Sequence, residues 1–111
     1  MNRTDLFAAV ARYFDLMEEG DKARVIDVFS ADATVVDDGH SYVGRAQVLG
    51  WLTGPASEFT TTSTWLSVAQ DDRASVVTIR LAGDFPGSPV DLRYEFAVGE
   101  SGLIDSLAIT A

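Results

Sequence analysis

Apolar residues recur at helical spacing over the first twenty positions of the chain. They form one stripe, with charged residues on the opposite face, and the stripe comprises Leu6, Val10, Tyr13, Phe14 and Met17. Thr4 suits the N-cap, and Gly20 suits the position just after the helix, where a left-handed backbone ends it. The pattern therefore predicts a first helix that buries one face and ends at Gly20.

Shorter elements follow this helix. Asp21 suits the N-cap of a second helix from about Lys22 to Phe29. The run "ATVVD" predicts a short strand that closes in the turn "DDGH", and "SYVG" predicts a second extended segment. A third helix is expected from Arg45 to Leu52, and Gly54-Pro55 should end it.

Beyond the third helix the pattern changes to alternation with a period of two residues, which indicates strands. Four strands are expected, Phe59–Ala69, Ala74–Ala82, Pro89–Val98 and Leu103–Thr110. Helices followed by a meander of longer strands predict an α+β fold.

Alternation within these strands also predicts which face is buried. From Val90 to Val98 every second residue is apolar, and the residues between begin with Asp91, Arg93 and Glu95. The helices should cover the apolar face. The other face, which also carries Arg80, suits cross-strand ion pairs or a contact between two copies of the chain.

Composition restricts the classes of function. At 111 residues the chain is expected to form one domain over residues 1–111. The net charge of −9 disfavours nucleic acid and anionic membrane surfaces as partners, and the absence of cysteine excludes disulfides. Because no apolar run approaches roughly 18 residues, and Asp5 and Arg12 interrupt the N-terminal segment, we expect a cytoplasmic protein.

One segment carries a family resemblance. "ARYFDLMEEGDKARVIDVFSADATVVDDG", residues 11–39, combines a tyrosine-bearing helix, "GD", a short helix ending in F-x-x-D-A-T-V, and an aspartate. This run resembles the nuclear transport factor 2-like superfamily, and within it the SnoaL-like polyketide cyclases and ketosteroid isomerases are most similar. "YVGRAQVLGWL", residues 42–52, is similar to that group's entry into a helix.

The resemblance implies an architecture. It is a cystatin-like α+β cone, in which a curved mixed β-sheet wraps around N-terminal helices and encloses a pocket. Such proteins are commonly homodimers that pack through the outer face of the sheet. The fold hosts enzymes and non-catalytic binders alike, so it leaves the activity open.

The resemblance also implies roles for particular residues. Asp37 stands where the isomerases carry the general base that moves a proton α to a carbonyl, and Tyr13 where they carry a donor to the oxyanion. Their second donor falls near Leu92, whereas Asp91 is one residue out of register and should face the other side. His40, the only histidine, is a candidate accessory proton carrier.

Each of these roles has a plain structural alternative. Asp37 and its neighbour Asp38 also suit a turn, Tyr13 also belongs to the apolar stripe, and a histidine beside a glycine is often an exposed turn residue. No metal is expected, because one histidine without a ligand cluster makes no usual site. No cofactor is implied either. We expect a pocket lined by Phe14, Phe29, Trp51, Trp65, Leu92 and Tyr94.

The sequence is compatible with three functions. The first is an enzyme that isomerises or cyclises a small hydrophobic carbonyl compound of polyketide, steroid or terpenoid type. The second is a non-catalytic binding module, in which Asp37 points outward or is neutralised by an arginine such as Arg45. The third is a dimerisation domain whose cavity is filled by Trp51 and Trp65.

Overall fold

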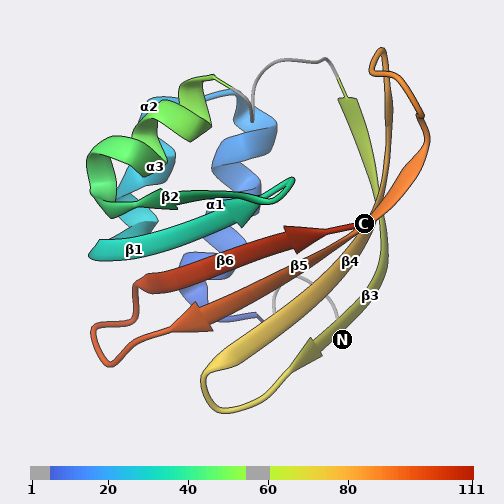
Figure 1. The fold of residues 1–111 in the computed structure, drawn as a ribbon. Coiled ribbons are helices and arrows are strands. Elements are labelled where there is room, and N and C mark those ends of the chain that lie inside the picture. Colours follow the sequence, from blue (N-terminus) through green and yellow to red (C-terminus); the bar gives the residue numbers. More distant parts are fainter. Residues whose placement is uncertain (1–5, 55–60) are drawn as a thin grey trace.

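The computed structural model describes residues 6–54 and 61–111, which form a six-stranded mixed sheet packed against three α-helices (Figure 1). The elements are α1 (Ala8–Glu19), α2 (Lys22–Val25), the 3-10 turn η2 (Ile26–Val28), β1 (Phe29–Asp37), β2 (His40–Val43), α3 (Gly44–Thr53), β3 (Thr61–Gln70), β4 (Ala74–Gly83), β5 (Val90–Val98) and β6 (Ile104–Thr110). The strand order is β2-β1-β6-β5-β4-β3. Only the β1–β6 pairing in this sheet is parallel. The predicted α+β fold is confirmed.

The first helix ends where the sequence predicts. Gly20 has a φ of 81°, and the backbone N–H groups of Gly20 and Asp21 donate to the carbonyls of Met17 and Leu16. These bonds satisfy carbonyls that the end of the helix would otherwise leave unpaired. At the other end, the backbone N–H of Phe7 donates to Gln70 Oε1 at 3.0 Å, so the far end of β3 ties down the helix start. Thr4 lies outside the described residues.

The second helix is shorter than predicted. The expected helix from Lys22 to Phe29 stops at Val25, continues as the turn η2, and gives way to strand at Phe29. The cause is a partner far along the chain, because Phe29 pairs with Ile104 in the parallel ladder to β6. A bulge separates this pair from the next one, which begins at Thr34. This pairing makes the strand start before "ATVVD". The local sequence carries no signal for it, so the early start was not predicted.

The remaining elements follow the prediction closely. β4, β5 and β6 each begin and end within one residue of the expected range. β3 is described from Thr61 onward, and Phe59 and Thr60 lie outside the described residues. In β5 the side chains of Phe96 and Val98 are buried.

The outer face carries the predicted charges. Arg80 and Asp91 are cross-strand partners, and Arg80 Nε lies 2.9 Å from Asp91 Oδ1. Arg93 Nη2 lies 3.0 Å from Glu95 Oε1. The predicted ladder of mixed charges is therefore confirmed.

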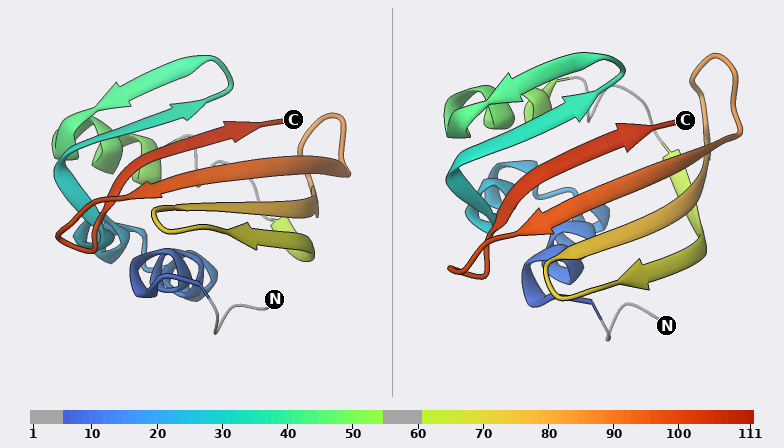
Figure 2. Two further views of the ribbon diagram at one scale, coloured as in Figure 1. Left: turned by 90° about the horizontal axis from the view of Figure 1, so that it is seen from below. Right: turned by 60° about the horizontal axis from the view of Figure 1, so that its bottom comes forward.

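The sheet curves around α1, which lies against its inner face (Figure 2). Tyr13 is at the centre of the core and packs edge-on against Phe14, Phe29 and Phe96, with ring centroids 5.0, 6.0 and 5.4 Å away. None of the helices in the two described ranges is long and apolar enough to span a membrane.

Phe29 tests this description of the core. The ring is fully buried, so Phe29→Ala should lower the free energy of unfolding by about 3–5 kcal/mol through lost burial and a residual cavity. Urea unfolding measures the change. Leu49→Ala, on an exposed face of α3, is the control and should cost about 1 kcal/mol or less. Equal losses in the two variants would place Phe29 outside the core.

Candidate functional site

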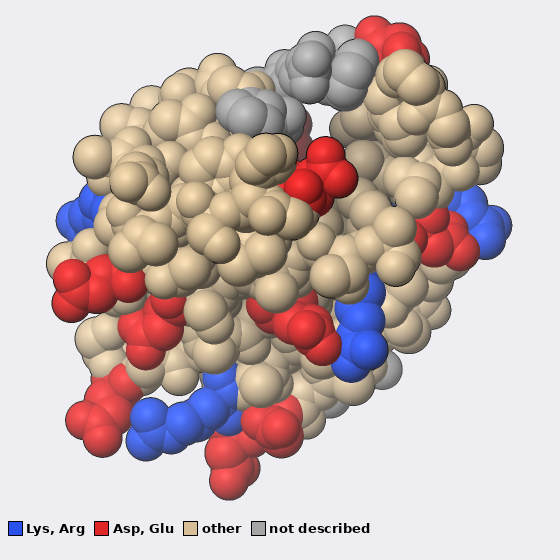
Figure 3. Space-filling model, in the orientation of Figure 1, with Lys and Arg blue, Asp and Glu red and all other residues tan. Residues whose placement is uncertain are grey.

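The curved sheet and the helices line an open cavity of about 1150 Å³. Its wall is built from α1, the end of β1 with the turn that follows, α3, the inner faces of β3, β4 and β5, the end of β6, and the loop between β4 and β5. Figure 3 shows the surface hollowed between the helical side and the β3–β4 side, with acidic side chains at the edge of the hollow.

Five of the six residues expected at the pocket line this cavity, namely Phe14, Trp51, Trp65, Leu92 and Tyr94. Phe29 is the exception. Phe29 begins β1, at the opposite end of the strand from Asp37. Its side chain is buried in the core, where it packs against Tyr13. Because Trp51 and Trp65 form the wall without filling the space, the cavity is not collapsed as the dimerisation hypothesis requires.

A two-residue turn sets the position of Asp37. Asp37 and His40 are the last pair of the β1–β2 hairpin, and Asp38 and Gly39 between them have φ values of 52° and 75°. Positive φ at both central residues is the geometry of a type I′ hairpin turn, for which Asp-Gly is a preferred sequence. Asp37 therefore closes the strand at the mouth of the cavity.

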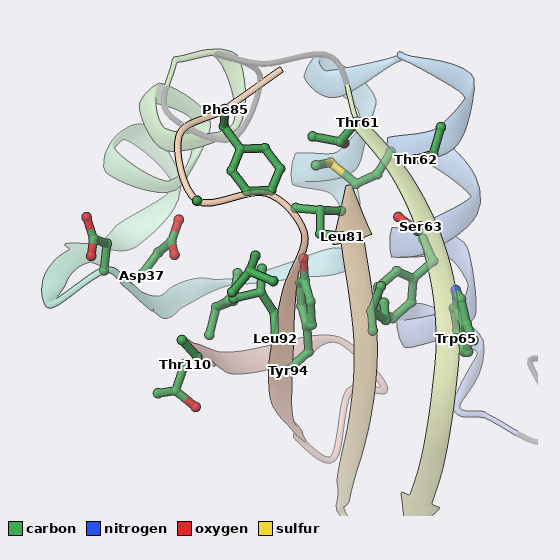
Figure 4. Close-up of a pocket in the computed structure, with 18 of the residues that line it drawn as sticks. Asp37, Thr61, Thr62, Ser63, Trp65, Leu81, Phe85, Leu92, Tyr94 and Thr110 are labelled. Atoms are coloured by element: carbon green, nitrogen blue, oxygen red, sulfur yellow. The ribbon is translucent and has the colours of Figure 1, made fainter. Parts of the chain in front are cut away.

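Sheet register brings Asp37 into line with a tyrosine. Asp37 pairs with Ile109 of β6, and Ile109 pairs with Tyr94 of β5. Laterally paired residues point to the same side of a sheet, and all three line the cavity. Figure 4 shows Asp37 on one side of the cavity and Tyr94 rising from β5 with its hydroxyl toward the open space.

One hydrogen bond orients the Asp37 carboxylate. The indole Nε1 of Trp51 donates to Asp37 Oδ2 at 3.0 Å. It is the only hydrogen bond to this carboxylate within residues 6–54 and 61–111, so Oδ1 is left for a ligand. Arg45, which the binding-module hypothesis pairs with Asp37, donates instead to the carbonyl of Phe29 at 2.9 Å.

Two tyrosines share the electrostatic environment of Asp37. Burial, followed by the influence of Tyr94 and Asp37, raises the pKa of Tyr13 well above its usual range. Burial and then Asp37 raise the pKa of Tyr94 to about 12. Both hydroxyls therefore stay protonated at neutral pH and available as hydrogen-bond donors. The site therefore combines a carboxylate with two neutral tyrosines in a wall of apolar and polar side chains.

The other predicted residues lie at the edge of this site or outside it. His40 is the hairpin partner of Asp37, but it is exposed and does not line the cavity. Asp38 is exposed but lines the rim. Leu92 faces the cavity, whereas Asp91 faces outward and bonds to Arg80, as the one-residue offset implies.

Two features of the site were missed in the sequence. Tyr94 was predicted to line the pocket but not to act as a hydrogen-bond donor. It follows Leu92 by two residues and therefore lies on the same face of β5. This spacing could have identified its hydroxyl as a donor. The bond from Trp51 to Asp37 had no signal, because it depends on how α3 packs beside the end of β1.

Comparison with known proteins assigns the chain to a family. Residues 10–100 match the model of the SnoaL-like domain, and the chain belongs to that family. This confirms the resemblance seen in the sequence. No curated protein sequence matches the chain.

Solved structures agree with this assignment. A candidate polyketide cyclase from Sinorhizobium meliloti is similar, with 30% identity and a TM-score of 0.90, covering 99% of this chain and 100% of that chain. SalBIII, an epoxide hydrolase/cyclase-like enzyme of pyran ring formation in salinomycin, has 24% identity and a TM-score of 0.72, covering 96% and 88%. A ketosteroid isomerase-like protein from Catenulispora acidiphila, solved with trimethylamine, has 17% identity and a TM-score of 0.77, covering 94% and 85%. The last two show the fold alone.

The raised pKa of Tyr94 predicts how stability depends on alkaline pH. The unfolded side chain loses its proton near 10 and the folded one near about 12. Between these values the folded state binds more protons than the unfolded state. The contribution of Tyr94 to the free energy of unfolding is therefore fully present below about pH 10 and is lost as pH rises toward about 12. Tyr94→Phe should make that fall shallower in urea unfolding between about pH 9 and about pH 11. Identical slopes in the variant and the original chain would contradict the shift.

Proposed function

We propose that this protein is a cofactor-free enzyme that moves a proton α to the carbonyl of a small hydrophobic compound of polyketide, steroid or terpenoid type. The outcome is an isomerisation or a cyclisation. One observation carries the proposal, namely the Asp37 carboxylate held by Trp51 in a cavity that two protonated tyrosines, Tyr13 and Tyr94, also line.

The substrate carbonyl accepts hydrogen bonds from Tyr13 and Tyr94, and Asp37 Oδ1 takes the proton from the α-carbon. The C–H electrons form a C=C bond, and the carbonyl oxygen becomes an enolate oxygen. In an isomerisation, Asp37 returns the proton to the γ-carbon and the carbonyl reforms. In a cyclisation, the α-carbon attacks a second carbonyl, and Asp37 returns the proton to the new alkoxide.

Electrostatic coupling favours this order of events. Burial is the main cause of the raised pKa of both tyrosines, and the Asp37 carboxylate adds to it. When Asp37 takes the proton, its share of the raised pKa disappears at the moment when negative charge arises on the substrate oxygen. The hydroxyls then become stronger donors in an apolar environment, where such interactions count most.

The size of the cavity and the family support the substrate class. A volume of about 1150 Å³ lies at the upper end of small-molecule sites, which are roughly 300–1,000 Å³. It is therefore suited to a compound with several rings or a folded chain. The 30% sequence identity to a candidate polyketide cyclase supports the same substrate class.

A non-catalytic binding module of the same fold is the alternative, and Leu92 favours it. Leu92 lines the cavity near the position where the isomerase resemblance implies a second acidic donor. An apolar residue there suits binding but contributes nothing to an oxyanion. The alternative predicts a ligand that binds without turnover, whereas the enzyme proposal assigns the second donor to Tyr94.

Asp37→Asn tests the base. Asparagine keeps an oxygen acceptor for Trp51 but has no carboxylate, so turnover should fall by about 10²–10⁴-fold while ligand affinity stays within about twofold. The assay follows conjugation of a β,γ-unsaturated cyclic ketone by ultraviolet absorbance, and calorimetry measures affinity for the conjugated product. Asp91→Asn, on the outer face beside Arg80, is the matched control, with turnover within about threefold of the unmodified protein. Unchanged turnover in Asp37→Asn would remove the base assignment.

The two tyrosine hydroxyls are tested by removing each one. Tyr13→Phe and Tyr94→Phe should each lower kcat by about 10²–10³-fold in the same assay, with KM changed little, because the hydroxyls act chiefly on the developing oxyanion. Tyr42→Phe is the control, since this third tyrosine is not part of the cavity wall. A loss in the control as large as in the other two variants would contradict the assignment.

A further inference from the structure

The loop between β4 and β5 forms part of the cavity wall. Phe85, Pro86 and Gly87 line the cavity, beyond the point where β4 ends at Gly83. Phe85 is half-buried, whereas Asp84 and Pro86 on either side of it are exposed. The loop therefore turns one aromatic ring toward the cavity and leaves its neighbours at the surface.

A tight turn holds Phe85 in place. Its central residues are Pro86 and Gly87, and Gly87 has a φ of 86°. The backbone N–H of Ser88 donates to the Phe85 carbonyl at 3.3 Å, which closes the turn. This is the pattern of a type II turn, in which proline fixes one φ and glycine adopts the positive one without strain. The Ser88 hydroxyl also accepts from the backbone N–H of Gly83 at 2.9 Å, so the base of the loop is tied as well.

The Phe85 ring lies beside the part of the cavity where the reaction is proposed. Figure 4 shows it pointing from the loop toward the open space that Asp37 and Leu92 border. Tyr94 rises from β5 into the same space. A ligand whose carbonyl meets Tyr94 and whose α-carbon meets Asp37 therefore has an adjoining ring against Phe85.

Phe85 adds an aromatic surface on the loop side of the cavity. The other rings of the wall come from α1 and the sheet, where the Phe14 centroid lies 4.8 Å from Trp65 and 5.6 Å from Tyr94, with both pairs edge-on. These rings form the inner wall, and the loop supplies the wall nearest the surface. A ligand ring between the two walls meets aromatic side chains on both sides.

We propose that Phe85 is a specificity-determining residue of this cavity. It acts as a preformed roof that favours a ligand with a flat, conjugated ring next to the reacting carbonyl over one with a puckered, saturated ring of the same size. Pro86 and Gly87 are positioning residues, because they act only through the direction of Phe85. The inference rests on the proposed function, since it concerns the ligand of the same cavity, and it narrows the class of that ligand.

The chemistry of ring contacts supports this selection. Two aromatic rings attract each other when offset-stacked or edge to face, by an amount beyond the burial of their surfaces. A puckered ring has no such π-system, and its projecting hydrogens leave fewer atoms at contact distance. Because the turn directs Phe85 before the ligand binds, little of the contact energy is lost in ordering the loop.

Two ketones with one ten-carbon skeleton test the roof by calorimetry on the intact chain. They are 2-tetralone, in which one ring is aromatic, and trans-2-decalone, in which both rings are saturated. Phe85→Leu should lower the affinity for 2-tetralone about fivefold. Leucine keeps an apolar side chain in this position, so the affinity for trans-2-decalone should stay within about twofold. Equal changes for the two ketones, or no binding of 2-tetralone to the original chain, would overturn the proposal.

Two glycine variants test the turn while they keep the Phe85 ring. Gly87→Ala and Gly102→Ala place alanine at φ values of 86° and 82°, and within the described structure the added Cβ meets nothing within 4 Å at either position. Both variants should therefore lose similar stability in urea unfolding through backbone strain alone. Gly102 lies in the turn between β5 and β6, where it donates to the Gly99 carbonyl, and it does not line the cavity.

Only the variant in the roof should change ligand selection. Gly87→Ala should lower the preference for 2-tetralone over trans-2-decalone about threefold, because it turns the Phe85 ring away from its contact. Gly102→Ala should leave that preference unchanged. The same preference in both variants would overturn the preformed roof.

The failure of this proposal is distinguishable from failure of the proposed function. If Asp37→Asn abolishes ketone turnover but Phe85→Leu affects the two ketones equally, only the role of Phe85 is wrong. If Phe85→Leu and Gly87→Ala both reduce the preference for 2-tetralone while no ketone is turned over, only the catalytic proposal is wrong.

Discussion

The parallel pairing of β1 with β6 is the constraint on which the rest of the structure depends. It joins the helical half of the chain to the antiparallel meander, and its register of Asp37 with Ile109 sets Asp37 in one row with Tyr94. Because side chains alternate across a strand, a shift of one residue would turn Asp37 to the outer face of the sheet, the face that carries the ion pairs of β4 and β5. The core holds this register, since Phe29, Ala33 and Val35 of the same strand are fully buried. The same register of β1 therefore determines both the packing of the core and the position of the Asp37 carboxylate.

The site shows how a half-buried carboxylate is accommodated with no cation among the described residues that line the cavity. The residues around Asp37 supply a donor on one side, the Trp51 indole, and neutral hydroxyl groups nearby in place of an arginine. An arginine in this position would hold the carboxylate more firmly, but it would also occupy the oxygen that a proton transfer needs. The indole bond fixes the orientation of the group and leaves one oxygen unbound by the described residues.

Much of this could be predicted from the sequence, for physical reasons that differ between residues. Alternation in β4 and β5 predicted the buried and charged faces, because each side chain's direction follows from its position along a strand. The left-handed Gly20 and the Asp38-Gly39 turn were readable because few residues tolerate positive φ. The start of β1 was not readable, since Phe29 is strand only by pairing with Ile104, far along the chain. The pocket assignment of Phe29 and the bond between Trp51 and Asp37 depend on how helices pack on the sheet, which no local pattern encodes.

The bond between Trp51 and Asp37 has a further consequence, which concerns light rather than chemistry. The described structure places both tryptophans of the chain, Trp51 and Trp65, in the cavity wall. The emission of an indole depends on the polarity around it and on its hydrogen bond, and here one indole is bonded to the carboxylate while the other packs beside Phe14. The intrinsic fluorescence of this protein is therefore a report on the interior of its own cavity, with no tryptophan elsewhere to dilute it. Occupancy of the site is open to observation in the unlabelled chain.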